Sequence, residues 1–516
     1  MPALQTAPAV PVIYPPNAAE ASRFLQQCAI AATDADIAAL QGMGYAAWLD
    51  AQFAKPAVQT NTAWLIAHGY AASTNQFSNA GVDNTVWRSL IAEQNPVMQR
   101  LAMFWLEYFV VSLAGLPTSW PQFLGAAYVD LLTRMAVANF RDLLAAVTLS
   151  PAMGEYLSLR GSLPADATSH RHPDENYARE VMQLFTLGLY QLAPDGSPLL
   201  VNGQPQPSYT QGDVTGLAAA LTGWDFAAAQ SSPAYATLPM VQVPGHHTTG
   251  STTFLGVTIP AGTSGAAALN IVLDTLFHHP NVAPFVARHL IQRLVTSNPS
   301  RAYIARVSAV FANDGTGVRG NMKAVIKAAL LDSEARNSSL PTAGRLREPM
   351  LRFAQWARTF NASSSTGNWT IGNTSDPATA LGQSPLRSPT VFNFFSPDYV
   401  PPGSTLAASG AVAPETQLLD ESTVAGYLNF MQRAIGSGIG DVSASYSSEL
   451  ALATNVSALL ARINLLLAAN QVDTATLGQI GAALNTIDAG TAAGKLARVE
   501  AAIFLVMATP TYQVLK

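Results

Sequence analysis

The sequence predicts a large, mainly α-helical protein. Apolar residues recur at three- and four-residue spacing along most of the chain, which is the pattern of amphipathic helices. The β-like run that stands out, Thr253 to Ile259, lies inside a stretch rich in Ser, Thr, Pro and Gly. At 516 residues, the chain exceeds the size at which one core usually stops growing. Length therefore allows about two to four domains, or one large α-domain with long insertions.

The elements are expected in the following order. Residues 1–17 are rich in Pro and Ala and predict an extended segment. A main helical domain is expected over 18–360, with helical spacing at 19–26, 35–53, 96–112, 128–150, from the segment 170–180 to about Tyr190, and at 210–222, 268–277, 282–296, 300–311, 321–331 and 347–360. It carries an insertion at about 227–268 that is either irregular throughout or contains a short β-hairpin. An irregular loop with a Pro- and aromatic-rich segment should follow at 361–404, and a helical region packed on the main domain at 405–516.

Composition excludes several classes of protein. Charged residues make up 11% and the net charge is −5, without a dense Lys/Arg stripe, which argues against a nucleic-acid partner. No run of about 20 apolar residues is present, so we expect no membrane span. The single Cys28 excludes an intrachain disulfide and a zinc or iron–sulfur site built from cysteines. No phosphate-binding or dinucleotide-binding motif appears, and we expect no cofactor.

The low proportion of lysine among the basic residues is informative about localisation. Only five of the 27 basic residues are lysines, and Ser, Thr and Asn are frequent, which favours an exported protein. No basic and apolar leader follows Met1. We expect a periplasmic or extracellular protein whose signal peptide is missing from this sequence, with a cytosolic protein as the alternative.

The densest group of ionisable residues is His170 to Glu180. Two His, two Arg, one Asp and two Glu fall within these eleven residues of a charge-poor chain. Pro173 suits the first helical position, and Glu175 and Arg179 form a favourable i, i+4 pair. Such a segment is either a buried ion-pair network that ties helices together or a site for acid/base chemistry.

Within the segment, some residues have local roles and others do not. Asp174 suits the first helical turn, where a carboxylate opposes the helix dipole. Asn176, Glu180 and Gln183 share one helix face, and together with His172 they have no such explanation. These are the residues that a polar ligand would need.

Glu107 is one carboxylate inside the apolar stretch 98–112. A buried acid without a partner is costly, so Arg100 or Arg134 should pair with it. The alternative is a catalytic acid with a raised pKa. Arg347-Glu348-Pro349 places another Arg–Glu pair at an expected helix start.

A Gly-rich loop contains His246 and His247. Adjacent residues of an extended chain point in opposite directions, so at most one of them faces a site. A metal would need His172 and nearby carboxylates as further ligands, and no HExxH spacing is present. Trp224 and Asp225 follow the helix expected at 210–222, where they line a pocket or belong to the core.

Several long motifs resemble one bacterial family. They are DENYAREVMQLFTLGLY at 174–190, YTQGDVTGLAAALTGW at 209–224, HHTTGSTTFLGVTIPAG at 246–262, HPNVAPFVARHLIQRLVTSNPS at 279–300, LREPMLRFAQW at 346–356 and the stretch 381–402. The family is catalogued as domain of unknown function DUF1800, and the resemblance runs from about Ala19 to Tyr512. It implies an exported bacterial protein, often encoded beside a sulfatase-like partner protein. The family has no settled reaction, so the resemblance assigns no catalytic residue.

Three functions remain open. The first is a secreted hydrolase or lyase that acts on a polysaccharide or similar neutral polymer with two carboxylates, Glu180 and either Asp174 or Glu107. The second is a non-catalytic exported module, and the third is a metal-dependent enzyme that uses His172, His247 and carboxylates. The candidate residues for the first are, for catalysis, Glu180, Asp174, Glu107 and His247, and for substrate binding, Arg179, Asn176, Trp224, Asp225 and His172.

Overall fold

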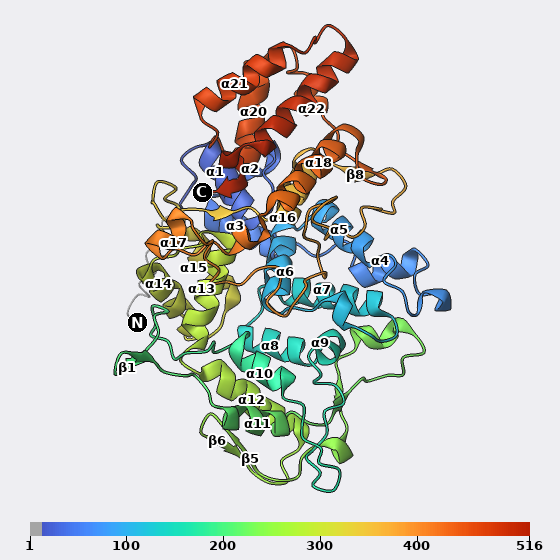
Figure 1. The fold of residues 1–516 in the computed structure, drawn as a ribbon, viewed down its shortest axis with the longest axis vertical. Helices are drawn as coiled ribbons and strands as arrows, with labels where there is room; N and C mark the ends of the chain where they lie inside the picture. The colour runs from blue at the N-terminus through green and yellow to red at the C-terminus, as the bar shows by residue number, and fades with distance from the viewer. Residues whose placement is uncertain (1–12) are drawn as a thin grey trace, which may run out of the picture.

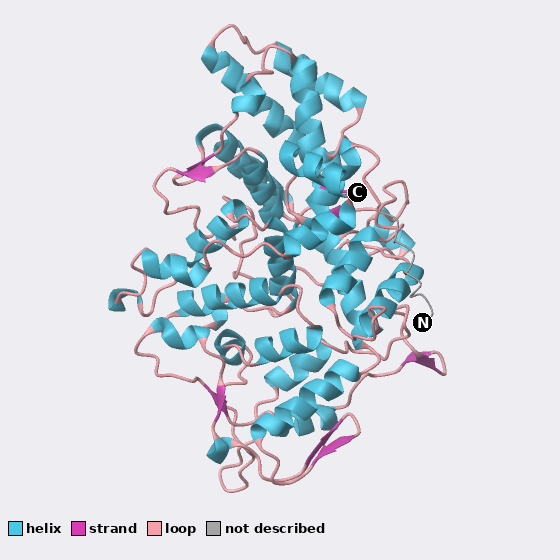
Figure 2. Cartoon of the chain, turned by 180° about the vertical axis from the view of Figure 1, so that it is seen from behind, coloured by secondary structure: helices cyan, strands magenta, loops and turns pink. Residues whose placement is uncertain are grey.

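The computed structural model describes residues 13–516 and confirms a mainly α-helical protein (Figure 1). The described part contains 23 α-helices, and its strands occur only as antiparallel pairs (Figure 2). Of the expected extended segment 1–17, residues 1–12 lie outside the described part, and residues 13–17 precede the first helix without forming a helix or strand.

The first part of the chain forms nine helices. They are α1 (Ala18–Cys28), α2 (Asp34–Met43), α3 (Tyr45–Phe53), α4 (Asn61–Ala67), α5 (Val82–Ala92), α6 (Pro96–Tyr108), α7 (Pro121–Met135), α8 (Phe140–Thr148) and α9 (Pro151–Tyr156). The expected stretch 35–53 is two helices because Gly44 adopts a φ of 78°, which favours glycine and ends α2.

The middle part contributes seven helices and four strand pairs. The helices are α10 (Asn176–Gln183), α11 (Gln211–Ala220), α12 (Gly265–His278), α13 (Val282–Leu294), α14 (Arg301–Ala312), α15 (Met322–Leu331) and α16 (Pro349–Thr359). The pairs are β1 (Leu200–Val201) with β2 (Gln204–Pro205), β3 (Trp224–Asp225) with β4 (Val241–Gln242), β5 (Thr252–Phe254) with β6 (Val257–Ile259), and β7 (Arg345–Leu346) with β10 (Val514–Leu515).

The insertion expected at 227–268 contains the β5–β6 hairpin at its predicted place. The hairpin packs against α11, and a Cβ at Gly216 would lie 1.8 Å from the Thr253 carbonyl oxygen. This close approach explains the glycine inside the helix. Asp213, which closes the capping box with Thr210, also accepts a hydrogen bond from the Leu255 amide at 2.6 Å.

The last part is again helical and returns to the start of the chain. Its helices are α17 (Thr405–Ser409), α18 (Glu421–Ser437), α19 (Ser447–Leu450), α20 (Val456–Ala468), α21 (Thr474–Asn485), α22 (Ala492–Ala508) and α23 (Pro510–Gln513), and β9 (Val442–Ser443) pairs with β8 (Ser363–Ser364). Helix α20 packs against α1, where the Ser22 hydroxyl donates to the Leu465 carbonyl at 2.6 Å (Figure 1).

Helix α6 lies at the centre of the core. All its residues from Val97 to Tyr108 are buried, and it contacts α1, α3, α5, α7 and α13. The buried apolar residues from Ala21 to Tyr512 form one continuous cluster. No helix of the described residues is both long and apolar enough to span a membrane.

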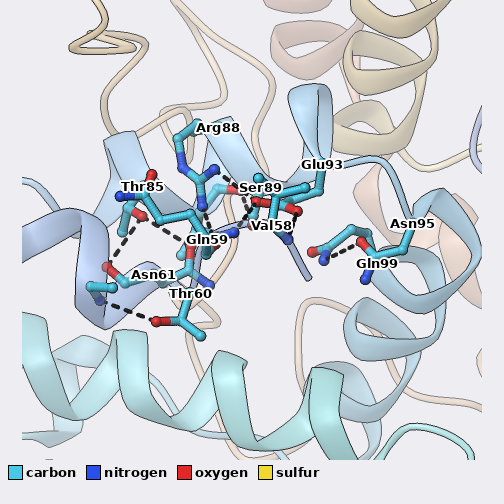
Figure 3. A network of polar contacts seen from close by, with 12 residues as sticks. Val58, Gln59, Thr60, Asn61, Thr85, Arg88, Ser89, Glu93, Asn95 and Gln99 are labelled. Carbon is cyan, nitrogen blue, oxygen red and sulfur yellow. Dashed lines mark hydrogen bonds and ion pairs between the residues drawn. The ribbon is translucent and has the colours of Figure 1, made fainter. Parts of the chain in front are cut away.

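A buried carboxylate holds the loop between α3 and α4 (Figure 3). Glu93, at the end of α5, accepts hydrogen bonds from the amides of Val58 and Gln59 at 2.9 and 3.3 Å. Arg88 donates to the same carboxylate at 2.8 Å and to the Gln59 carbonyl at 2.7 Å. Backbone groups and one Arg therefore satisfy this buried acid, which has a structural role.

Candidate functional site

We expected the helix in the charged segment 170–180 to begin at Pro173. In the structure it begins at Asn176. The preceding chain is held in a turn by paired backbone bonds between Asp166 and Arg171 at 3.0 and 3.1 Å. Asp174 closes the next turn by accepting from the Asn176 amide at 2.9 Å. His172, Asp174 and Asn176 are all exposed.

The Glu175–Arg179 pair forms as predicted, at 3.1 Å, but it lies at the surface rather than buried. Gln211 and Thr215 of α11 each donate to the Glu175 carboxylate at 2.8 Å. The Thr215 bond is the main reason that the pKa of Glu175 is lowered. Arg179 also donates to Gln211 at 3.1 Å, so this network links α10 to α11.

Glu180 lies on another face of α10 and is half-buried. Its Oε2 is buried and has no hydrogen-bond partner among the described residues. Burial raises the pKa of Glu180, and the charge of Arg179 opposes the rise. The hydroxyl of Tyr209 donates to Gln183 at 2.8 Å, one helical turn after Glu180. Glu180 therefore presents, from the middle of α10, a buried carboxyl oxygen without a hydrogen-bond partner among the described residues.

Glu107 lies in the core, away from these residues. Its closest cation is Arg293 of α13, whose Nε is 3.6 Å from Oε2. Burial and the negative charge of Glu348 raise the pKa of Glu107 well above its usual range. Arg100 contributes an opposing charge, but its guanidinium donates to the Arg293 carbonyl at 2.5 Å. The other partner expected for Glu107 was Arg134. That prediction was wrong, because Arg134 is exposed.

The adjacent histidines point in opposite directions, as expected: His246 is exposed and His247 is buried. His247 Nδ1 lies 3.0 Å from the Thr222 carbonyl oxygen, which ties the loop to the end of α11. Trp224 lies in the core, and Asp225 forms an ion pair with Arg160 at 2.8 Å.

A cavity of about 380 Å³ lies where α10 ends against α13. Its walls come from the end of α10, the turns that follow it, one face of α13 and the loop around Pro397. The lining residues are Gln183, Leu184, Leu187, Gly188, Leu189, Tyr190, Leu192, Gly196, Pro198, Phe285, Arg288, His289, Gln292, Phe392, Ser396, Pro397 and Asp398. None of the nine candidate residues predicted from the sequence is among the lining residues of this cavity in the described part of the chain. The nearest of them along α10 is Glu180, one helical turn before the lining residue Gln183.

The prediction of a helix to Tyr190 was wrong, and this difference creates the cavity. Helix α10 ends at Gln183, and the amides of Leu187 and Gly188 both turn back to the Met182 carbonyl. Gly188 has a φ of 72°, and a Cβ there would lie 3.0 Å from the Phe285 ring. The chain therefore leaves the helix axis and exposes Tyr190 beside α13.

His289 is the titratable group in this cavity that the sequence reasoning missed. Its Nδ1 lies 2.8 Å from the Phe285 carbonyl oxygen. Burial lowers the pKa of His289 to about 4. The positive charge of Arg288 also lowers this pKa, whereas the hydrogen bond to Phe285 raises it. A neutral ring that donates from Nδ1 keeps Nε2 as a hydrogen-bond acceptor. The available signal was its place beside Arg288 on a largely apolar helix.

The residues proposed for metal binding are not grouped. Within residues 13–516, no three His, Cys, Asp or Glu side chains come together so that they could hold a metal ion. His172 is exposed, whereas His247 is buried against Thr222. The arrangement gives no support to the metal-dependent alternative.

Comparisons with known proteins give one match. No curated protein and no solved structure matches the chain. The family model described as a protein of unknown function, DUF1800, matches residues 23–514. With nearly its whole length matched, the chain belongs to the DUF1800 family.

Proposed function

We propose that this protein is an exported hydrolase or lyase that acts on a neutral polysaccharide or similar polymer at the cavity between α10 and α13. The observation that carries the proposal is the pair of exposed aromatic rings near the half-buried His289 in the cavity, with Glu180 one helical turn from the lining residue Gln183. Tyr190 and Phe392 are 44% and 45% exposed at the cavity, unusual values for large aromatic side chains. Sugar rings stack on such exposed aromatic faces.

The acid/base groups come from two helices. Glu180, with its raised pKa and unpaired Oε2, can hold a proton and donate it. His289 on α13 is neutral and presents an acceptor nitrogen. A donor and an acceptor near one cavity are what bond cleavage by acid/base catalysis requires.

The second candidate is a non-catalytic exported binding protein. The walls of the cavity are largely leucine, proline and aromatic side chains, which would also suit simple binding. This alternative predicted a charged segment 170–180 that is buried and fully paired, with no pocket reaching it. The exposure of His172, Asp174 and Asn176 speaks against this alternative, whereas the absence of residues 170–180 from the lining of the cavity agrees with it.

The proposal includes export of the protein and its association with a sulfatase-like partner protein. The low lysine content supports export. A sulfatase-like partner would act on the same polymer, and a pull-down with the product of the neighbouring gene tests that association.

The proposal is tested with two substitutions and two matched controls. Glu180→Gln should lower the release of reducing ends from a panel of neutral polysaccharides by about 10²-fold or more. Phe392→Ala should weaken oligosaccharide binding about tenfold, which corresponds to about 1.4 kcal/mol. Two controls should change neither: Glu421→Gln, at an exposed residue of α18, and Phe77→Ala, at a ring elsewhere that is 79% exposed.

The outcomes separate the candidates. Binding without cleavage, unaffected by Glu180→Gln, would favour the non-catalytic module. A panel that is neither bound nor cleaved by the unsubstituted protein would refute the substrate class.

A further inference from the structure

We propose that a second hollow beside this cavity is a second subsite, which binds a hydroxyl-bearing unit of the ligand through Asp195 and Arg301. The inference rests on the proposed function for the first subsite, the cavity between α10 and α13. It extends the ligand to at least two units. It also assigns two recognition residues outside the charged segment 170–180.

The second hollow adjoins the cavity. Its volume is about 370 Å³, close to that of the cavity, and both are of the size of small-ligand sites. Helix α13 packs beside α14, and both helices contribute to the second hollow (Figure 1). The two hollows share part of their walls, as neighbouring subsites for an extended ligand do. The residues that line both are Gly196, Pro198, Arg288 and Gln292.

The chemical character of the walls differs between the two hollows. The cavity is lined largely by leucine, proline and aromatic side chains. An aromatic half and a polar half suit the two kinds of surface of a sugar, its C–H face and its hydroxyl groups. The polar residues that line only the second hollow are Asp195, Ser197, Ser297, Asn298 and Arg301.

Asp195 lies on a turn that is fixed by its own hydrogen bonds. Its Oδ1 accepts from the amide and the hydroxyl group of Ser197, at 2.9 and 2.6 Å. The Ala193 amide donates to the Ser197 carbonyl at 2.8 Å, which closes the turn. No hydrogen bond to Oδ2 is formed among residues 13–516. One oxygen of this half-buried carboxylate is therefore held, and the other is free to accept from a ligand.

Arg301 is the neighbour of this turn on α14. A Cβ at Gly196 would lie 3.2 Å from the side chain of Ile304, so the turn packs against α14. Arg301 lies one helical turn before Ile304, on the same face of the helix. Hydrogen bonds from Ser197 lower the pKa of Asp195, and the positive charge of Arg301 lowers it further. The two charged groups thus lie near each other, yet they form no ion pair.

No structural role accounts for the place of Arg301. Its side chain is exposed and forms no ion pair or hydrogen bond with any group of residues 13–516. It is the first residue of α14, where the positive end of the helix dipole disfavours a cation. On the same helix Arg306 is paired with Asp332 at 2.7 Å. An unpaired cation at an unfavourable position in the wall of a hollow indicates a binding role.

Gln292 is an independent indication of a polar ligand. It lines both hollows and is 4% exposed. Its Nε2 donates to the Ser297 carbonyl at 3.2 Å, and this bond sets the orientation of the amide group, because the reverse would place two oxygens face to face. Oε1 is buried and accepts no hydrogen bond from residues 13–516. A hydroxyl group bound where the two hollows meet would supply the missing donor.

Another wall of the second hollow is held in place by Asn298. Its side chain donates to the Val412 carbonyl at 2.8 Å and accepts from the Val412 amide at 2.9 Å. The segment around Val412 is therefore fixed against the loop between α13 and α14. The hollow does not depend on a ligand for its shape.

The pair of charges favours a neutral ligand with adjacent hydroxyl groups. The free oxygen of Asp195 accepts from one hydroxyl group, and the Arg301 guanidinium donates to the oxygen of the next. The carboxylate of Asp195 would repel an anion that Arg301 alone could bind. Arg288, which also lines this hollow, is already paired with Asp398.

The test uses a fluorine reporter in the second hollow. Cys28 is the one cysteine of the chain and is fully buried, so a cysteine introduced by Val412→Cys can be labelled selectively with a trifluoromethyl thiol reagent. The fluorine chemical shift is followed during titration with xylitol and with the methyl glycosides of glucose, galactose, mannose and N-acetylglucosamine. All these probes carry adjacent hydroxyl groups, and at least one should give a saturable shift.

Two substitutions and two matched controls identify the recognition residues. Asp195→Asn and Arg301→Gln should each weaken the apparent affinity about tenfold or more, because each removes a charged hydrogen-bonding partner. Asparagine at position 195 keeps an oxygen for Ser197, so the turn should persist. Asp142→Asn and Arg134→Gln remove the same charges at exposed residues that line neither hollow and should leave the titration unchanged.

The outcomes are independent of the polysaccharide screen. No saturable shift with any probe would overturn the second subsite, and so would a titration that neither substitution alters. A saturable shift that both substitutions weaken, together with a failed polysaccharide screen, would retain the second subsite and reject the proposed polymer substrate. Cleavage of a polymer without binding of any probe beside Val412 would reject the second subsite alone.

Discussion

The substitution Glu107→Gln should stabilise the protein, and the gain should depend on pH. The pKa of Glu107 is raised in the folded state from an ordinary value of 4.5. Below that value the carboxyl group is protonated in the folded and the unfolded chain alike. As pH rises above 4.5, the unfolded chain loses the proton and the folded chain keeps it, so stability falls by about 1.4 kcal/mol per pH unit. The loss continues until the pH reaches the folded-state pKa.

Glutamine at position 107 removes this loss because its side-chain amide does not titrate. The free energy of unfolding of the variant should therefore match that of the unsubstituted protein near pH 4.5 and exceed it increasingly above. Urea denaturation followed by tryptophan fluorescence measures the difference, with the m-value checked for constancy. Glu348→Gln is the matched control and should destabilise at neutral pH, because the lowered pKa of Glu348 contributes stability above pH 4.5 that is lost as pH falls toward 2. A difference between Glu107→Gln and the unsubstituted protein that does not change with pH would refute a protonated Glu107.

Two further predictions concern buried charges. Arg345→Met leaves Glu348 and Glu415 buried without their cation and should cost about 3–5 kcal/mol of unfolding free energy in urea; an unchanged midpoint would contradict the ion-pair network. Glu93→Gln should speed hydrogen exchange of the Val58 and Gln59 amides about tenfold or more, since a charged acceptor is lost, while exchange in α6 stays unchanged; equal exchange at the two amides would show that the loop is held by other contacts.

The sequence predicted those parts of the fold that depend on neighbours in the chain. The β5–β6 hairpin pairs residues three to seven positions apart, and α11 lies within the stretch 210–222 where helical spacing was found. The sequence-based prediction was wrong where a contact between residues far apart in the chain determines the end of a helix. Helix α10 ends at Gln183 although the apolar spacing continues, since Gly188 turns the chain against Phe285, about a hundred residues later.

The candidate site divides in the same way. The pairing of Glu175 with Arg179 is a helix-spacing property, and it was predicted and forms. The sequence also distinguished Glu180 from its neighbours as a residue without a local structural role. In the structure its buried Oε2 has no hydrogen-bond partner among the described residues. His289 gave little signal, because its environment comes from burial beside Phe285 on a helix that reads as ordinary core. Whether Glu180 acts in catalysis stays a prediction.

The cluster around Glu107 shows why a chain so poor in charge is informative once it is folded. Its carboxyl groups come from α6, from the start of α16 and from the segment before α18, and spacing along the sequence cannot relate them. The sequence suggested Arg347 as the partner of Glu348, but Arg345 takes that place, and Arg347 donates to the Tyr512 carbonyl at 2.7 Å. Buried ion pairs contribute little net stability compared with apolar packing, so stability alone does not account for placing several of them at the centre of the core. A buried carboxyl group that accepts no hydrogen bond within the described residues adds a further cost beside such a network. Buried polar atoms without partners often mark functional groups, so a role of Glu107 beyond stability stays a prediction.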